Sequence, residues 1–250
     1  MQSTALVYSD DFLNNLNRRE RKKARKLLRQ NNSALHLSEI HPKTKNQALV
    51  WDEYQKGMNL LCHGVAGTGK TYLSIFLGLK EALRSNTGRN LTIVRSVVPT
   101  RDIGYLPGTA SQKCKGYEQP YANICNQLFN KGDAYENLKM RNYVNFMSTS
   151  FIRGITIENS VVLVDECQNM TFHELDSIIT RLGENCRIIF SGDFRQTDLK
   201  TNEEKQGLKM FMKVLNDMEE FSCVEFDQHD IVRSSLVKNY IVSKLNYGIV

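Results

Sequence analysis

The chain has 250 residues, enough for one substantial hydrophobic core and few for two full domains. Hydrophobic residues make up 41% and charged residues 24%, which excludes a disordered or fibrous chain. No apolar run approaches the roughly 20 residues of a membrane helix, so we expect no membrane partner. The net charge of +6 permits a polyanionic partner without requiring one.

The six cysteines include no C-x-x-C pair, and the five histidines show no metal-binding spacing. This pattern is typical of reduced thiols in a reducing compartment. The N-terminus also lacks the cationic and then apolar segments of a secretory signal. We therefore predict a cytoplasmic protein, in the host cytoplasm if a phage encodes it.

Residues 1–45 are predicted to form a basic helical N-terminal extension and a linker. Residues 18–29 contain eight basic residues and one acidic residue, and apolar residues recur there at helical spacing. This helix is either a nucleic-acid-binding arm or a solvated helix docked by a few leucines, and the sequence favours neither. We expect the main domain to span residues 46–250.

The next feature is a complete phosphate-loop pattern, G-x-x-x-x-G-K-[ST], at residues 64–71. A predicted buried strand precedes it and a predicted helix follows it, as in known phosphate loops. Its glycines allow backbone angles that a Cβ forbids, so that N–H groups of the loop and of the helix start can face an anion. The loop consists of Gly64, Val65, Ala66, Gly67, Thr68, Gly69, Lys70 and Thr71. Lys70 is placed to reach the β- and γ-phosphates, and the Thr71 hydroxyl to bind Mg²⁺.

Apolar runs and helical periodicities alternate along the whole main domain. Residues 99–119 interrupt them with glycines, prolines and the basic Arg101, Lys113 and Lys115, which predicts a long functional loop. Strands are predicted at residues 58–62, 91–98, 161–164, 186–190 and 221–226. Helices are predicted at residues 46–56, 71–85, 120–130, 133–141, 171–182, 206–218 and 231–245. Pro120 would head its helix, and Thr171 with Glu174 would form a capping box.

This alternation predicts an α/β fold with a mostly parallel five-stranded sheet and helices on both faces. Ligands bind beyond the carboxyl ends of the strands in such sheets. Asp165 and Glu166 follow the most apolar predicted strand. Asp165 suits Mg²⁺, and Glu166 suits a general base that orients the attacking water.

Asp193 and Gln196 follow the next predicted strand, where Gln196 could contact the γ-phosphate or its water. Phosphoryl transfer also benefits from a cation near the developing charge, for which Arg181, Arg195 and Arg233 are candidates. We predict ATP as the nucleotide in preference to GTP.

Several motifs in a fixed order resemble PhoH-type ATPases, in a compact version of the kind found in bacteriophages. The resemblance covers roughly residues 44–245. It rests on the phosphate loop and on N-Q-A-L at 46–49, R-S-V-V-P-T-R-D-I-G-Y-L-P-G at 95–108, P-Y at 120–121, F-I-R-G-I-T-I at 151–157, V-D-E-C-Q-N at 164–169, S-G-D-F-R-Q-T-D-L at 191–199 and D-I-V-R-S at 230–234.

The resemblance implies a RecA-like P-loop NTPase core related to helicase motors, acting on RNA as a homo-oligomeric ring, a hexamer. It also implies that Gln47 reads adenine and that Asp193 and Gln196 sense the γ-phosphate. Arg233 would act near the phosphates of the same or a neighbouring subunit. The chain departs from the family at Ser96, where the family has Pro, and at Ser234, where the family has His.

Three functions remain open at this level. The first is an ATPase coupled to RNA or single-stranded nucleic acid. The second is a nucleotide-switched binding or assembly protein with little turnover, which Glu166 disfavours. The third is a small-molecule kinase with residues 99–119 as a lid, which the segment from Asp193 to Gln196 disfavours.

Overall fold

The described part of the chain covers most of the predicted main domain. The computed structural model describes residues 35–84, 86–96 and 110–248. The predicted basic helix at 18–29 and Arg101 of the predicted loop lie outside the described residues. Among the helices that are described, none is long and apolar enough to cross a membrane.

A six-stranded sheet forms the centre of the unit Leu37–Val250, and its strand pairs are parallel. The strand order is β3-β2-β4-β5-β1-β6. The strands are β1 (Asn59–Gly64), β2 (Asn90–Arg95), β3 (Val144–Ser148), β4 (Ser160–Asp165), β5 (Cys186–Gly192) and β6 (Phe221–Phe226). The parallel sheet is confirmed, but the prediction of five strands was wrong, because it missed β3.

Burial explains why β4 was visible in the sequence and β3 was not. Every residue of β4 is buried, so the strand reads as a continuous apolar run. In β3 only the terminal Val144 and Ser148 are buried, and the three residues between them are half-buried. This short edge strand therefore has neither a long apolar run nor a clean alternation.

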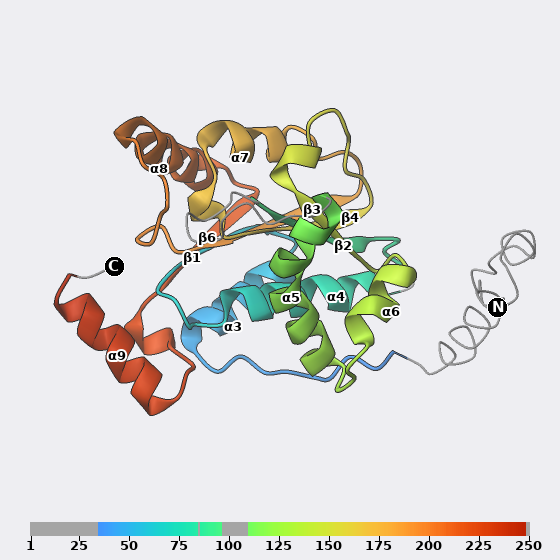
Figure 1. The fold of residues 1–250 in the computed structure, drawn as a ribbon, viewed down its shortest axis with the longest axis horizontal. Helices are drawn as coiled ribbons and strands as arrows, with labels where there is room; N and C mark the ends of the chain where they lie inside the picture. The colour runs from blue at the N-terminus through green and yellow to red at the C-terminus, as the bar shows by residue number, and fades with distance from the viewer. Residues whose placement is uncertain (1–34, 85, 97–109, 249–250) are drawn as a thin grey trace, which may run out of the picture. The chain divides into compact units, whose positions relative to one another are not determined.

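Helices cover both faces of the sheet, with α7 and α8 on one face and α3, α4, α5 and α6 on the other (Figure 1). The predicted capping box at the start of α7 is confirmed, since Thr171 and Glu174 each accept from the other's backbone N–H. The helices are α3 (Lys45–Gln55), α4 (Lys70–Ala82), α5 (Ala110–Leu128), α6 (Ala134–Met140), α7 (Phe172–Ile179), α8 (Asn202–Asp217) and α9 (Ser235–Asn246).

Helix α5 corrects the predicted loop at residues 99–119. It begins at Ala110, and Pro120 lies inside it instead of at its head. A proline inside a helix costs one backbone hydrogen bond and crowds the preceding turn. The helix continues because Tyr121, Cys125 and Leu128, which lie on one helical face, are fully buried at 0% exposure.

Two later helices begin at positions other than those predicted. Helix α8 starts four residues earlier than the predicted residue 206, behind a capping box formed by Thr201 and Glu204. Helix α9 starts at Ser235 instead of residue 231, because Ile231 is buried in extended conformation after a short 3₁₀ helix. In both places local capping and packing set the boundary.

The carboxyl ends of the central strands meet at one edge of the sheet. In the strand register Asp165 lies beside Ser191, and His63 lies beside Gly192. Gly64, the last residue of β1, lies beside Phe226 of β6. The phosphate loop, the acidic pair and the segment after β5 therefore start from the same edge, as the sequence predicted.

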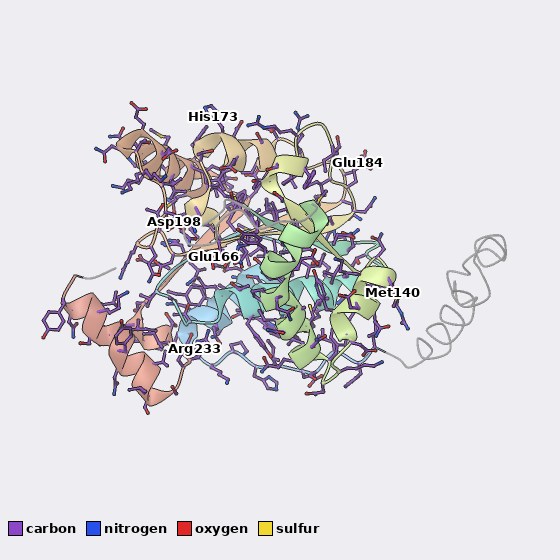
Figure 2. All side chains as sticks on the ribbon, in the orientation of Figure 1. Met140, Glu166, His173, Glu184, Asp198 and Arg233 are labelled. Atoms are coloured by element: carbon purple, nitrogen blue, oxygen red, sulfur yellow. The ribbon has the colours of Figure 1, made fainter. Side chains whose placement is uncertain are left out.

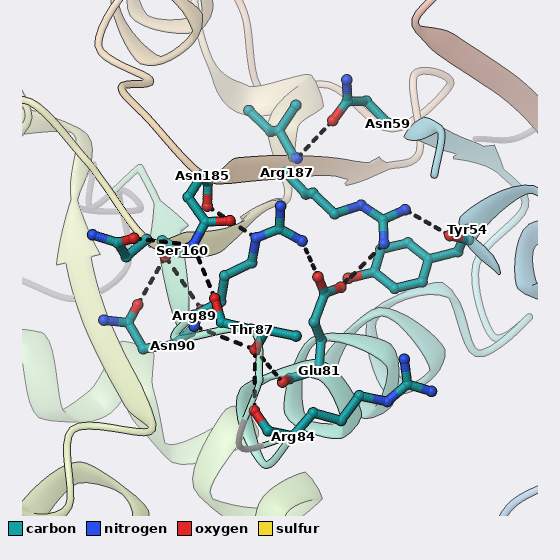
Figure 3. Close-up of polar contacts among 12 residues, drawn as sticks. Tyr54, Asn59, Glu81, Arg84, Thr87, Arg89, Asn90, Ser160, Asn185 and Arg187 are labelled. Carbon is teal, nitrogen blue, oxygen red and sulfur yellow. Dashed lines mark hydrogen bonds and ion pairs between the residues drawn. The ribbon is translucent and has the colours of Figure 1, made fainter. Parts of the chain in front are cut away.

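The opposite edge is held by an ionic network around Glu81 at the end of α4 (Figure 3). Glu81 accepts hydrogen bonds from Tyr54 and Arg89, and from Arg187 Nη1 at 3.1 Å. Arg187 Nη2 also donates to the carbonyl oxygen of Tyr54 in the last turn of α3, at 2.6 Å, and to that of Met58 just before β1, at 2.9 Å. This network anchors both helices far from the phosphate loop.

Candidate nucleotide-binding site

The phosphate loop has the backbone conformation that an anion cradle requires. Gly64, Gly67 and Gly69 have φ angles of 117°, 76° and 82°, a region that favours glycine. Gly69 is the N-cap of α4, and no side chain caps the helix there. The first N–H groups of α4 and its dipole therefore point into the loop without a side-chain partner.

Lys70 places a buried cation inside this loop. Its side-chain Nζ donates to the carbonyl oxygens of Gly64 at 2.9 Å and Val65 at 2.8 Å, and to Thr68 Oγ1 at 3.3 Å. Burial lowers the pKa of Lys70, while the carboxylate of Asp193 opposes that shift. No carboxylate in the described part of the chain forms an ion pair with Lys70. A buried ammonium whose partners are neutral oxygens suits an anionic ligand.

Thr71 and Asp165 join the loop to the end of β4. Thr71 Oγ1 donates to Asp165 Oδ1 at 2.9 Å, and the hydroxyl of Tyr121 donates to Asp165 Oδ2 at 3.0 Å. Burial raises the pKa of Asp165, as does the neighbouring charge of Glu166, while the hydrogen bonds from Thr71, Ser191 and Tyr121 lower it. Both oxygens of the carboxylate are thus held in place at 4% exposure.

These oxygen atoms fit the ligands that Mg²⁺ prefers. The ion takes few protein ligands in phosphate-binding sites and keeps waters and substrate oxygens. The described residues contain no cluster of three or more His, Cys, Asp or Glu side chains that could hold a metal by itself. Thr71 and Asp165 therefore fit a cation that arrives with a phosphate ligand.

Glu166 leaves the end of β4 in a conformation that is rare for its residue type. Its φ is 53° and its ψ is 37°, in the left-handed region. The other described non-glycine residues with positive φ are all asparagines, which tolerate that region better. Such strain costs of order 1–2 kcal/mol and is typical of functional positions.

Asp193 connects the end of β5 to the phosphate loop. Its carboxylate accepts from the backbone N–H of Arg195 at 3.2 Å and lies close to the backbone N–H of Ala66 in the loop. Burial raises the pKa of Asp193, and these hydrogen bonds and Lys70 oppose the shift. The structure therefore places Asp193 against the loop. Gln196 is exposed, and its backbone N–H donates to the Asp193 carbonyl at 2.8 Å.

Gln47 lies behind the phosphate loop. Its side-chain Nε2 donates to the Thr68 carbonyl at 2.8 Å, and its Oε1 accepts from the backbone N–H of Lys43 at 2.8 Å. The side chain is 7% exposed, and its Nε2 would lie 3.1 Å from a Cβ on Gly69. In the structure Gln47 thus supports the loop backbone, and its recognition of adenine stays a prediction.

Arg233 packs on the phosphate loop of its own chain. The backbone N–H of Val232 donates to the Gly67 carbonyl at 3.0 Å. A Cβ on Gly67 would lie 3.0 Å from Arg233 Cγ and 3.4 Å from Ile241 Cδ1. The segment before α9, labelled at Arg233 in Figure 2, therefore covers one side of the loop.

The other two candidate arginines lie elsewhere. Arg195 Nη2 forms an exposed ion pair with Glu225 Oε1 at 3.4 Å. Arg181 follows α7 at the opposite edge of the sheet, where its carbonyl accepts from Ile157 N–H at 2.8 Å. Among the three, only Arg233 contacts the phosphate loop.

The structure adds two residues that we had not assigned to the site. Tyr121, on α5, donates to Asp165, and its hydroxyl lies close to Arg95 at the end of β2. Gln168, two residues after Glu166, donates to the Glu166 carboxylate at 2.6 Å. Both stand in quoted motifs, but nothing in those motifs alone indicates which atoms the side chains contact.

Comparison with known proteins identifies the family. The family model described as PhoH-like protein matches residues 39–244. A PhoH-like protein of Synechocystis is 32% identical over 202 residues, which is 81% of this chain and 61% of that protein. Protein PhoH of Escherichia coli is 31% identical over 177 residues, 69% of this chain and 49% of that protein. The chain thus spans about half to three-fifths of the length of these relatives.

Among solved structures, the large terminase from a thermophilic bacteriophage aligns at a TM-score of 0.47 and 14% identity, covering 80% of this chain and 50% of that chain. The Pif1 helicase from Candida albicans aligns at a TM-score of 0.39 and 15% identity, covering 83% and 44%. The family match and the complete phosphate loop at the carboxyl edge of a parallel sheet define a RecA-like P-loop NTPase core. The chain belongs to the PhoH-like protein family.

Proposed function

We propose that the protein binds ATP with Mg²⁺ and hydrolyses it. The observation that carries this proposal is the hydrogen bond of 2.9 Å between Thr71 of the phosphate loop and Asp165 of β4. It brings two metal-suited oxygens beside a buried lysine and next to Glu166. The place of Gln47 behind the loop supports ATP as the nucleotide.

In the proposed reaction a water oxygen bonds to the γ-phosphorus, the bond to the β,γ-bridging oxygen breaks, and ADP and phosphate form. Lys70 and the N–H groups of the loop would hold the phosphate oxygens, and Thr71 with Asp165 would hold the metal. When bound, Mg²⁺ neutralises part of the phosphate charge. Glu166 orients the water and accepts its proton. Asp193 and Gln196 sense the γ-phosphate, and Arg233 contributes positive charge beside the loop.

Replacing Tyr121 with phenylalanine tests the metal assignment. The change removes the donor to Asp165 Oδ2 and keeps the buried ring, whose exposure is 0%. Loss of such a supporting hydrogen bond typically weakens metal affinity tenfold or more. We expect the Mg²⁺ concentration for half-maximal turnover to rise about tenfold. Tyr143→Phe is the control, because that hydroxyl has no hydrogen-bond partner in the described part of the chain, and an equal rise there would contradict the assignment.

We further propose that turnover is coupled to RNA or single-stranded DNA, in a homo-oligomer that is a hexameric ring. The basic residues 18–29 support a polyanionic partner. The exposed Leu236 and Tyr240 of α9, at 79% and 67%, support an assembly surface next to the loop. A cytoplasmic location agrees with the reduced cysteines.

Phosphate release with and without RNA or single-stranded DNA tests the coupling. We expect the strand to stimulate release, and the stimulation to weaken as salt rises, because contacts with backbone phosphates release counterions. Mass measurement of the same samples with a nonhydrolysable ATP analogue reports the oligomer. No stimulation by either strand at low salt would refute the coupling and leave basal hydrolysis unaffected.

A further inference from the structure

We propose that Gln168 is a positioning residue that couples Glu166 to the segment after β5, residues 193–197. The inference rests on the proposed hydrolysis and deepens it. Gln168 would orient the Glu166 carboxylate, and that orientation would change when the segment after β5, which contacts the phosphate loop, is displaced.

The two ends of the Gln168 amide face different partners. Nε2 donates to Glu166 Oε2 at 2.6 Å, and Oε1 accepts from the backbone N–H of Asp193 at 3.1 Å. The backbone carbonyl oxygen of Gln168 also accepts from Thr197 Oγ1 at 2.8 Å. An amide is the side-chain group that donates at one end and accepts at the other, so neither a carboxylate nor a hydrocarbon can replace both contacts.

Tight packing fixes the position of the Gln168 side-chain amide. Gln168 lies in a 3₁₀ turn, Cys167–Asn169, and is 3% exposed. A Cβ on Gly192 would lie 2.6 Å from Gln168 Oε1 and 2.8 Å from Cys167 Sγ. The absence of a side chain at Gly192 is therefore what allows the amide to reach across from β4 to β5.

These contacts form a continuous path from the phosphate loop to Glu166. The Asp193 carboxylate lies close to Ala66 and Lys70 of the phosphate loop, the Asp193 N–H donates to the Gln168 amide oxygen, and the Gln168 amide nitrogen donates to Glu166. The backbone of Glu166 is strained, with a φ of 53°, and its carboxylate accepts from Gln168 Nε2. A displacement of the loop or of Asp193 by a γ-phosphate is thus passed to the residue proposed to orient water.

A purely structural role for Gln168 predicts a different result. If the amide only tied the turn to β5, its loss would lower stability and nucleotide binding together. A positioning role predicts that turnover falls while nucleotide affinity stays close to that of the wild type. The two roles are therefore distinguished by whether a Gln168 variant lowers kcat alone or also raises KM for ATP.

The test compares Gln168→Glu and Gln168→Met, with the exposed Gln206→Met on α8 as the matched control. Gln168→Glu keeps an acceptor for the Asp193 N–H and removes the donor to Glu166. A hydrogen bond to a charged group corresponds to a factor of about ten to a hundred, so we expect kcat to fall by that factor and KM for ATP to change less than about threefold. In a Glu166→Gln background, Gln168→Met should change kcat by less than about twofold. Unchanged kcat, additive losses, or an equal loss of nucleotide affinity would overturn the proposal.

Hydrogen exchange separates this inference from the proposed hydrolysis. In the wild type, adding the nonhydrolysable ATP analogue should change amide protection in the phosphate loop and in residues 165–169. In Gln168→Met the change in the phosphate loop should persist, and the change in residues 165–169 should disappear. If the wild type shows this pattern without turnover, hydrolysis is refuted and the coupling stands. If residues 165–169 still respond in Gln168→Met, the coupling is refuted.

Discussion

Phosphate release should fall by about a hundredfold or more when Glu166 is replaced with glutamine, while nucleotide affinity stays within a few-fold of the wild type. The glutamine keeps the length of the side chain and an oxygen that accepts from Gln168 Nε2. It cannot accept a proton from water at neutral pH. The change therefore removes the proposed base and leaves the Thr71–Asp165 contact and the loop intact.

The control for this prediction is Glu184→Gln. Glu184 is exposed at the opposite edge of the sheet, after α7 (Figure 2). Its replacement should leave turnover unchanged. Equal phosphate release from wild type and Glu166→Gln would contradict the hydrolytic role and favour a nucleotide-switched binding protein with little turnover.

Replacing Gly64 with alanine should unfold or severely destabilise the domain. Gly64 has a φ of 117°, and an added Cβ would lie 2.1 Å from the Phe226 carbonyl oxygen and 2.8 Å from the Phe226 nitrogen. These are backbone atoms of the neighbouring strand, which pairs with Gly64 in the sheet. Backbone strain and overpacking each cost about 1–3 kcal/mol, so we expect a loss of about 2–5 kcal/mol in the free energy of unfolding.

Denaturant unfolding measures this loss, and Gly57→Ala is its matched control. Gly57 has a φ of 97° and no atom within 4 Å of an added Cβ, so its alanine variant carries the backbone strain without the clash. We expect Gly57→Ala to cost about 1 kcal/mol and to bind nucleotide normally. Equal losses at the two glycines would contradict the steric argument about β6. Any folded Gly64→Ala protein should bind nucleotide weakly, because the loop begins at this residue.

Local patterns in the sequence alone predicted much of the fold and of the candidate site. The phosphate loop could be predicted because glycines, a lysine and a threonine at that spacing are typical of phosphate binding. The hydrophobic pattern on either side of the loop predicted the strand before it and the helix after it. The fully buried β4 was readable because a strand covered on both faces is a continuous apolar run. The placement of Asp165 and Asp193 near the loop followed from parallel strands that end at one edge.

Contacts between distant segments were decided by the tertiary structure. The half-buried β3 and the continuation of α5 through Pro120 depend on neighbours that the sequence does not display locally. Asp165, the partner of Tyr121, lies 44 residues away, and Asp193, one partner of Gln168, lies 25 residues away. A motif records which residue types are present, whereas the atom that each side chain contacts depends on how the strands and helices pack. For that reason the sequence predicted a nucleotide site, and the packing showed how Glu166 is held within it.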